Sequence, residues 1–234
     1  MNNLIFKSGN LFKSEKQTLV NTINCVGVMG VGVAKKAKQL FPSMYDDYSK
    51  RCEKKQILPG IPYLWKNPDL NGKWILNFPT KDHWRSPSRL EWVEKGLDFF
   101  IKNYQEWGIS SIAFTALGCG KGGMWWIDIK PIMERYLLQI DMPVEIYIPQ
   151  IKSAEKAVMY AKTELLKQFK GQIRDIELVR SFHAGEDKWY DWTKEKNISL
   201  RIIGISGINS ELENLQSTIF KKYGVKLKLK TSEI

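Results

Sequence analysis

The alternation of apolar and polar positions divides the first two thirds of the chain into short strands and amphipathic helices. Apolar runs bounded by turn residues predict buried strands, and apolar residues at intervals of three or four predict helices. The clearest helix spans 88–107, where Leu90, Val93 and Leu97 recur at helical spacing. Strands are predicted at 4–7, 18–23, 74–78, 111–117 and 144–148, and helices at 33–40, 43–54 (with Ser43 as its N-cap), 88–107 and 127–138. This alternation predicts a mixed, mainly parallel sheet between two layers of helices.

The pattern changes after Pro149, where a lysine-rich helix is predicted over 153–169. Beyond it, the pattern predicts strands at 176–182, 200–205 and 225–229, a helix at 209–223, and a polar, aromatic loop at 183–197. We therefore expect an α/β domain over residues 1–150 and a small second α/β unit over residues 151–234. The chain has no internal repeat and no low-complexity segment.

A glycine-rich loop follows the second predicted strand. Gly27, Gly30 and Gly32 stand in a nearly uncharged segment that ends where a helix is predicted to begin. Glycine lets the backbone approach a ligand closely, and the free N–H groups at a helix start attract anions. The order strand, glycine loop, helix therefore predicts a phosphate-bearing ligand. Its spacing G-x-x-G-x-G is the reverse of the dinucleotide motif, and an ordinary strand-to-helix turn is the alternative.

A second glycine-rich loop makes an ordinary strand-to-helix turn the weaker interpretation of the first. The predicted strand at 111–117 runs into Gly118-Cys-Gly-Lys-Gly-Gly-Met124, again before a helical pattern. Glycine loops at the ends of strands in one α/β sheet flank a common ligand site. The two loops together favour a nucleotide-like ligand.

The segment after the strand at 74–78 contains a candidate catalytic residue. Five residues with functional side chains follow one another there: Lys81, Asp82, His83, Trp84 and Arg85. The neutral form of a lysine is favoured in a partly closed site near other cations, and a neutral amine is a nucleophile. Such an amine can attack an aldehyde-like sugar carbon. We expect Lys81 between the two glycine loops in the order of the sheet; a solvent-exposed lysine without a chemical role is the alternative.

The aromatic and basic residues of the same segment suit a nucleic acid. Trp84 with Arg85 and Arg89 can stack on a base and contact phosphate. The alternative is that Trp84 covers the helix expected to begin at Ser88.

Composition limits the other possibilities. The net charge of +11 is spread through both parts of the 234 residues and suits a polyanionic partner, although it also fits a merely lysine-rich protein. Three cysteines without a C-x-x-C motif fit a reduced, cytoplasmic protein, and two histidines argue against a zinc site. Cys25 and Cys119 have no histidine partner in their loops and are expected to pack. No apolar run is long enough for a membrane span, and the N-terminus lacks a signal-peptide pattern.

Taken together, these motifs resemble a known family. Residues 1–150 are similar to a macro domain, an α/β/α fold that binds ADP-ribose, and most similar to the branch of the DarG antitoxins and the terminal ADP-ribose protein glycohydrolases. The motifs that carry the resemblance are Gly9-Asn10-Leu11, Asn21-Thr-Ile-Asn24, Gly27-Val-Met-Gly-Val-Gly32, Thr80-Lys81 and Leu117-Gly-Cys-Gly-Lys-Gly-Gly123.

The resemblance implies a role for each motif. Asn10 replaces an aspartate that holds the adenine amino group in many members, Asn24 falls at the contact to the distal ribose, and Lys81 falls on the catalytic lysine of the branch. The first loop would enclose the ribose and diphosphate, and the second would cradle the phosphates. Besides the catalytic Lys81 and Asn24, the implied ligand-binding residues are Asn10, Leu11, Asn21, Gly27, Met29, Gly30, Val31, Gly32, Val33, Thr80, Leu117, Gly118, Cys119, Gly120, Lys121, Gly122, Gly123 and Met124. No metal and no cofactor are implied.

One departure from the family pattern affects the expected substrate. Protein-directed members carry an aspartate in the second loop, where this chain has Gly122. The leading hypothesis is therefore a hydrolase that removes ADP-ribose from a nucleobase in DNA, as antitoxin or repair partner of a DarT-like ADP-ribosyltransferase. The alternatives are a non-catalytic reader of ADP-ribose, a hydrolase of protein-linked or O-acetyl ADP-ribose, and a scaffold whose residues 151–234 bind the toxin.

Overall fold

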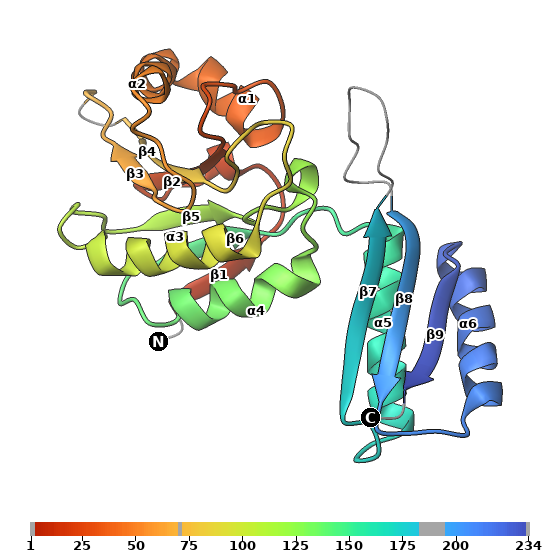
Figure 1. The fold of residues 1–234 in the computed structure, drawn as a ribbon. Helices are drawn as coiled ribbons and strands as arrows, with labels where there is room; N and C mark the ends of the chain where they lie inside the picture. The colour runs from red at the N-terminus through yellow and green to blue at the C-terminus, as the bar shows by residue number, and fades with distance from the viewer. Residues whose placement is uncertain (1–2, 70–71, 183–194, 233–234) are drawn as a thin grey trace. The chain divides into compact units, whose positions relative to one another are not determined.

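A computed structural model describes residues 3–69, 72–182 and 195–232 and divides the chain into two units, one up to Pro149 and one from Gln150 (Figure 1). Each unit has its own sheet. Among the described helices, none combines the length and the apolar character that crossing a membrane requires.

The first unit contains a six-stranded sheet in the order β1-β6-β5-β2-β4-β3. All neighbouring strands pair in parallel except β3, which runs antiparallel to β4 at one edge. The central strands are buried along almost their whole length, as expected for strands covered on both faces. The strands are β1 (Leu4–Lys7), β2 (Thr18–Ile23), β3 (Tyr63–Trp65), β4 (Trp74–Pro79), β5 (Ile112–Thr115) and β6 (Val144–Tyr147).

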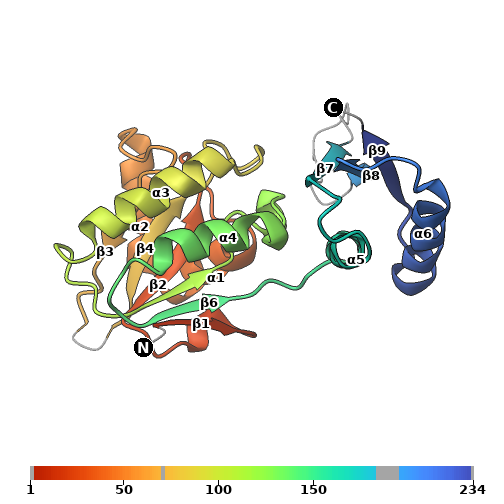
Figure 2. The same cartoon turned by 90° about the horizontal axis from the view of Figure 1, so that it is seen from below.

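Helices cover both faces of this sheet. α1 and α2 lie on one face, and α3 and α4 lie on the other (Figures 1 and 2). The expected three-layer α/β/α fold is confirmed. The helices are α1 (Gly32–Leu40), α2 (Pro42–Glu53), α3 (Leu90–Asn103) and α4 (Trp126–Leu137), with short 3-10 turns η1 (Leu11–Lys13) and η2 (Gly120–Gly122).

The two faces of the sheet have different cores. Beneath α1 and α2, the fully buried Tyr48 and Met44 pack on Leu19 and Ile75 of the sheet. On the other face the core is aromatic: the rings of Phe100 and Phe114 meet edge to face at 5.4 Å, and a Cβ at Gly96 of α3 would collide with the ring of Phe78.

The N-cap predicted for one helix and the start predicted for another are wrong. α2 begins at Pro42 and its N-cap Phe41 makes no side-chain capping bond, so Ser43 is not the cap. Proline suits the first helical position because its fixed φ is already helical and it has no N–H group to satisfy. α3 begins at Leu90 rather than Ser88, because the Ser88 backbone is engaged with the second glycine loop instead of the helix.

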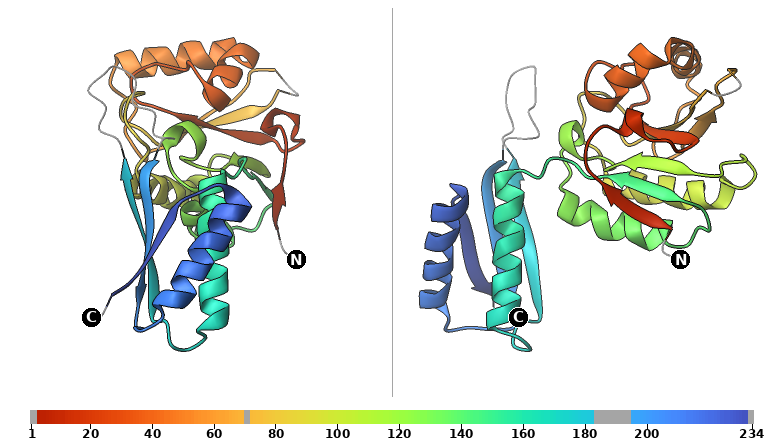
Figure 3. Two further views of the ribbon diagram at one scale, coloured as in Figure 1. Left: turned by 90° about the vertical axis from the view of Figure 1, so that its right-hand side faces the viewer. Right: turned by 180° about the vertical axis from the view of Figure 1, so that it is seen from behind.

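The second unit is a three-stranded sheet in the order β7-β8-β9, with β7 antiparallel and β9 parallel to the central β8. Figure 3 shows α5 and α6 on the same face of this sheet, and α5 presents Ala157, Val158, Ala161 and Leu165 to its core. The elements are α5 (Ser153–Gln168), β7 (Asp175–Phe182), β8 (Glu195–Ile203), α6 (Asn209–Tyr223) and β9 (Leu227–Ser232).

The strand bounds predicted in this unit need correction. β8 ends at Ile203 instead of residue 205, since Gly204 with φ of 102° turns the chain away from the sheet. β9 begins at Leu227 instead of residue 225. β8 also includes residues 195–197 of the predicted loop, whose remaining residues, 183–194, lie outside the described part of the chain.

A buried carboxylate lies on β6 of the first unit. Glu145 Oε1 is 2.6 Å from Lys7 Nζ and 3.7 Å from Lys16 Nζ, and Ser14 Oγ donates to Oε2 at 2.7 Å. Burial alone would raise the pKa of the Glu145 carboxyl, but the bonds from Lys7 and Ser14 outweigh it and leave the pKa below its ordinary value. A carboxyl with a lowered folded-state pKa stabilises the fold above its unfolded pKa, and this contribution is lost as the pH falls through the folded value.

We expect the substitution Glu145→Gln to lower the free energy of unfolding at pH 7 by about 1 to 2 kcal/mol, since charge-assisted bonds to a buried group are lost. The difference from the unsubstituted chain should begin to shrink once the pH falls below the unfolded-state pKa of about 4.3, and should disappear only below the lower folded-state pKa of Glu145. Urea unfolding at a series of pH values measures both effects.

Asp98→Asn is the matched control. Asp98 is also 2.6 Å from a lysine, Lys102, but its side chain is 44% exposed, against 5% for Glu145. Exposed pairs contribute little, so this variant should change stability by less than about 0.5 kcal/mol. Equal losses in the two variants would contradict the importance of the buried network.

Candidate functional site

Four of the predicted site segments follow strands that all run in the same direction. β1, β2, β4 and β5 belong to the parallel part of the sheet, so the segments that follow them meet at its carboxyl edge. These segments contain Asn10, the first glycine loop, Lys81 and the second glycine loop. The order of the strands nevertheless corrects one expectation: β2 lies between β5 and β4, so Lys81 does not stand between the two loops in the sheet.

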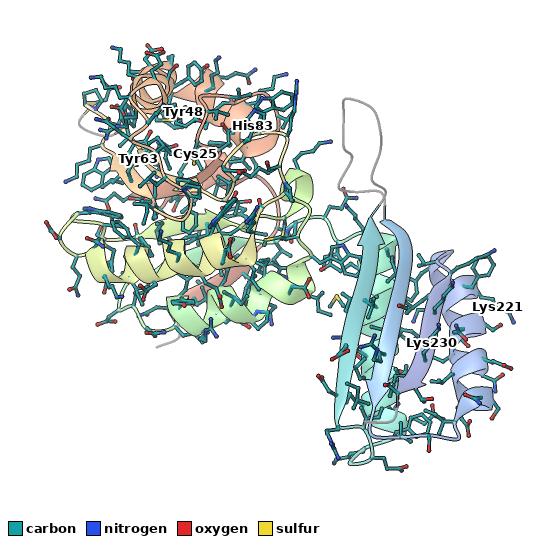
Figure 4. The ribbon with its side chains drawn as sticks, in the orientation of Figure 1. Cys25, Tyr48, Tyr63, His83, Lys221 and Lys230 are labelled. Atoms are coloured by element: carbon teal, nitrogen blue, oxygen red, sulfur yellow. The ribbon has the colours of Figure 1, made fainter. Side chains whose placement is uncertain are left out.

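Asn24 organises the first glycine loop. Its Oδ1 accepts the backbone N–H of Val26 at 3.0 Å, and its Nδ2 donates to the carbonyl of Val28 at 2.6 Å. The hydroxyl of the buried Tyr48 on α2 donates to the Asn24 carbonyl at 3.0 Å, and Tyr45 Oη donates to the carbonyl of Gly27 at 3.2 Å. Cys25 and Tyr48 are labelled in Figure 4. The amide side chain of Asn24 thus shapes the loop from within.

The loop leads into an open helix start. The N-cap of α1, Val31, makes no side-chain capping bond, and the first turn contains no acidic residue. An uncapped helix start presents N–H groups and the positive end of the helix dipole to an anion. Val26, Val28 and Val31 are also exposed, between 38% and 57%. The loop therefore offers backbone donors within an apolar rim.

Lys81 connects the two glycine loops in space. Its Nζ donates to the backbone carbonyl of Lys121 in the second loop at 2.8 Å. Its own carbonyl accepts the thiol of Cys25 at 3.2 Å, and the Cys25 N–H donates to the carbonyl of Asp82 at 3.0 Å. Lys81 thus contacts the second loop through its side chain and the first loop through its backbone, although its strand, β4, is not adjacent to β5.

Burial changes the acid–base behaviour of this cluster. Desolvation is the main reason why the pKa of Lys81 lies below its ordinary value; Lys121 lowers it further, and the carboxylate of Asp82 opposes the change. Desolvation also raises the pKa of the Cys25 thiol to about 12. The lowered pKa makes the neutral, nucleophilic form of the Lys81 amine easier to reach. The Cys25 thiol instead stays protonated near neutral pH and acts as a hydrogen-bond donor.

Ser88 belongs to the candidate site, although none of the sequence motifs includes it. Its Oγ donates to Thr80 Oγ1, next to Lys81, at 3.2 Å, and its N–H donates to the carbonyl of Gly122 at 2.9 Å. Thr80 and Ser88 are both buried. Ser88 therefore joins the Lys81 segment to the second loop; the only sequence signal is its place just ahead of the helical pattern of α3.

The second loop is packed against this serine. A Cβ at Gly122 would lie 2.5 Å from Ser88 Oγ, and one at Gly118 would lie 2.5 Å from Met124 Sδ. Gly118, Gly120 and Gly123 also have positive φ angles of 70°, 66° and 85°. Side chains at these positions are excluded by space or by backbone conformation.

Other predicted site residues lie deeper or act locally. Asn21 is 1% exposed; its Nδ2 donates to Asn77 Oδ1 of the paired strand at 2.8 Å and lies 3.8 Å from Met29 Sδ. It supports the first loop from below. Asn10 is exposed and its Oδ1 caps η1 by accepting the N–H of Phe12 at 3.0 Å. Leu11, Met29 and Leu117 are buried. Within the described residues, no group of three or more histidine, cysteine or acidic side chains could hold a metal.

The sequence matches the macro domain family over residues 20–133. The solved macrodomain of Mycobacterium tuberculosis DarG is 38% identical, with a TM-score of 0.61, and the match covers 63% of this chain and 98% of that structure.

This chain belongs to the macro domain family. The assignment covers the first unit, and the glycine loops and Lys81 are therefore parts of a macro domain.

Longer relatives match this macro domain as well. The solved structure of Thermosipho africanus DarTG in complex with ADP-ribose is 40% identical, with a TM-score of 0.62, over 64% of this chain and 42% of that chain. A DNA ADP-ribosyl transferase–DNA ADP-ribosyl glycohydrolase fusion protein of Thermosipho africanus is 41% identical over 163 residues, 63% of this chain. The chain spans less than half the length of the curated relatives it matches, between 42% and 45%.

We expect Gly122→Ala to lower the free energy of unfolding by about 1 to 3 kcal/mol, because the added methyl group overlaps Ser88 Oγ in a packed region. In a Ser88→Ala background the hydroxyl is gone and the same substitution should cost less. A double-mutant cycle in urea measures the difference between the two costs.

Gly30→Ala is the matched control in the first loop. A Cβ at Gly30 would meet only Val28 Cγ1, at an ordinary 3.9 Å, and the backbone φ there is not positive. The control should leave stability nearly unchanged. A cost for Gly122→Ala that is equal in the presence and absence of the serine hydroxyl would show that Ser88 does not fill this space.

Proposed function

We propose that this chain is an ADP-ribosyl glycohydrolase that removes ADP-ribose from a nucleobase of DNA. The observation that carries the proposal is the Lys81 amine, which is bonded to the second glycine loop, is joined through its backbone to the first, and has a lowered pKa. Relatives named as DNA ADP-ribosyl glycohydrolases, 38% to 41% identical, support the same activity.

The glycine loops would hold the ADP-ribose part of the substrate. The uncapped start of α1 supplies donors and a helix dipole for the diphosphate. Asn24 and the loop it organises would enclose the distal ribose. Binding in a fixed geometry presents the anomeric carbon to Lys81 and lowers the entropic part of the barrier.

The chemical step uses the neutral amine of Lys81. Its lone pair attacks the anomeric carbon of the distal ribose, and the bond from this carbon to the base nitrogen breaks. The base leaves with the bonding electrons and takes up a proton, while the lysine nitrogen loses one. Water then hydrolyses the lysine–sugar bond, releases ADP-ribose and restores the amine.

The packing around Gly122 supports DNA as the linked macromolecule. Protein-directed relatives are expected to carry an aspartate at this position. Here Ser88 occupies the space that a side chain at Gly122 would need. Without a carboxylate in the second loop, hydrolysis would depend on the lysine.

We expect Lys81→Ala to retain ADP-ribose binding and to lose hydrolysis of ADP-ribosylated single-stranded DNA by a factor of at least about a hundred, since the nucleophile is removed. Calorimetry with free ADP-ribose measures binding, and release of ADP-ribose from the DNA measures turnover. ADP-ribosylated protein and O-acetyl ADP-ribose, assayed in parallel, test the substrate class.

Lys121→Ala is the matched control, because it keeps the backbone carbonyl that accepts the Lys81 amine. Removing the Lys121 charge raises the pKa of Lys81. Since the neutral amine reacts, the rising limb of the pH–rate profile should move to higher pH with the maximal rate retained. Full turnover by Lys81→Ala would exclude this mechanism, and tight binding without any product would favour a reader.

We further propose that residues 151–234 bind a DarT-like ADP-ribosyltransferase in the cytoplasm, so that the chain is both its antitoxin and the repair enzyme for its product. In support, the Thermosipho africanus relative joins a transferase and a glycohydrolase in one chain. The face of the second sheet opposite α5 and α6 (Figure 3) also carries the exposed Arg201, Lys228 and Lys230, which alternate along β8 and β9 with the buried Leu200, Leu227 and Leu229.

Lys228→Glu with Lys230→Glu should weaken capture of the full-length chain by an immobilised transferase of this type at least about tenfold, because charge reversal removes the basic side chains through which the proposed docking face would attract acidic groups of the partner. Lys221→Glu with Lys222→Glu on α6 is the control and should bind as before. Equal capture of both variants would place the contact elsewhere.

A further inference from the structure

Two tryptophans close to Lys81 in the sequence each carry an arginine over the ring. The guanidinium carbon of Arg85 lies 4.6 Å from the ring centroid of Trp84, and that of Arg89 lies 4.8 Å from the ring centroid of Trp92. Both arginines are exposed and both rings are half-buried. The rings of Trp84 and His83 also contact each other in a tilted arrangement, with a centroid separation of 5.5 Å and an interplanar angle of 31°. We call Trp84, Arg85, Arg89 and Trp92 the Trp84 surface.

The turn at residues 82–86 that carries Trp84 is fixed by its own bonds. The N–H of His83 donates to Asp82 Oδ1 at 2.6 Å, and the N–H of Ser86 donates to the His83 carbonyl at 3.0 Å. The Asp82 carbonyl is bonded in turn to the N–H of Cys25 in the first glycine loop. A surface fixed in this way loses little conformational entropy when it binds a ligand.

The Trp84 surface lies close enough to Lys81 for one short stretch of DNA to reach both. Three peptide steps separate Lys81 from Trp84, so their Cα atoms are at most about 11 Å apart. Neighbouring nucleotides along one stacked strand are about 3.4 Å apart. The separation therefore corresponds to at most about three nucleotides.

The charges at this surface favour a polyanion. Arg85 and Arg89 are exposed, as is Lys121 of the second loop. Within the described part of the chain, two carboxylates near the arginines are Asp82, which is bonded into the turn, and Glu91, which is 3.4 Å from Arg89 in an exposed pair. An exposed pair of this kind is weak in water, so a phosphate can replace Glu91 at the arginine.

We infer that the Trp84 surface binds the single-stranded DNA next to the modified nucleotide. The inference rests on the proposed function, since it assigns this surface to the same substrate. Unpaired bases stack on tryptophan rings and guanidinium planes in any sequence, and the arginines contact the phosphates. The surface selects a single strand because the bases of a duplex are already paired and stacked.

The experiment measures the affinity of the full-length chain for a fluorescent, unmodified oligothymidylate by anisotropy over a range of salt concentrations. Trp84→Ala should weaken binding about tenfold, and Trp84→Phe should retain most of it. Arg85→Ala with Arg89→Ala should reduce the slope of log affinity against log salt by about 1.4, from about 0.7 for each phosphate on a single strand. A duplex of the same length should bind more weakly than the single strand.

Arg51→Ala is the matched control, because the Arg51 guanidinium also lies over an aromatic ring, that of Tyr63, at 4.7 Å. In Figure 4, Tyr63 and His83 are labelled at well separated positions on the first unit. The control should leave the affinity for the single strand unchanged. Thermal unfolding of every variant, together with unchanged affinity for free ADP-ribose, shows that the fold is retained.

Two readouts separate this inference from the proposed function. If the unsubstituted chain releases ADP-ribose from DNA but its single-strand affinity does not depend on Trp84 and the two arginines, the inference is wrong and the function stands. If the affinity depends on these residues but no ADP-ribose is released from DNA, the surface stands and the function is wrong. Equal affinities for single strand and duplex would also overturn the inference.

Discussion

The arrangement of the candidate site depends on the attachment of one segment, residues 80–88, to two glycine loops. Cys25 binds the carbonyls of Lys81 and Asp82, Ser88 binds Gly122, and the Lys81 amine reaches the carbonyl of Lys121. These bonds join the ends of three neighbouring parallel strands. Because parallel strands present their carboxyl ends together, a few hydrogen bonds are enough to hold the loops in one geometry.

The same attachment produces the electrostatic properties of the site. Packing between the loops removes water from Lys81, which disfavours its charged form, while Lys121 repels the charge and Asp82 offsets part of the effect. The fold thus lowers the pKa of the Lys81 amine mainly through burial. Close packing also restricts the second loop to glycine at Gly122, so the choice of residue there and the position of Ser88 depend on each other.

Much of the fold could be predicted from the sequence, because buried parallel strands and amphipathic helices have distinct apolar patterns. The strands at 4–7 and 18–23 have the predicted bounds, and α1, α2 and α4 begin within one residue of their predicted starts. Helix starts were less predictable where tertiary bonds compete with local signals: Ser88 bonds to Thr80 and Gly122 instead of beginning α3. In the second unit, Gly204 ended β8 earlier than its apolar pattern indicated.

The sequence by itself determined the strand–loop–helix order, the two glycine loops and the presence of a lysine near them, because these depend on local composition and spacing. Only the tertiary structure decided which groups meet. The strand order placed β2 between β4 and β5, yet the side chain of Lys81 reaches the second loop. Asn21, which the motif grouped with the ligand contacts, turned inward to Asn77. Such contacts join residues about 40 to 60 positions apart in the chain, and no local pattern encodes them.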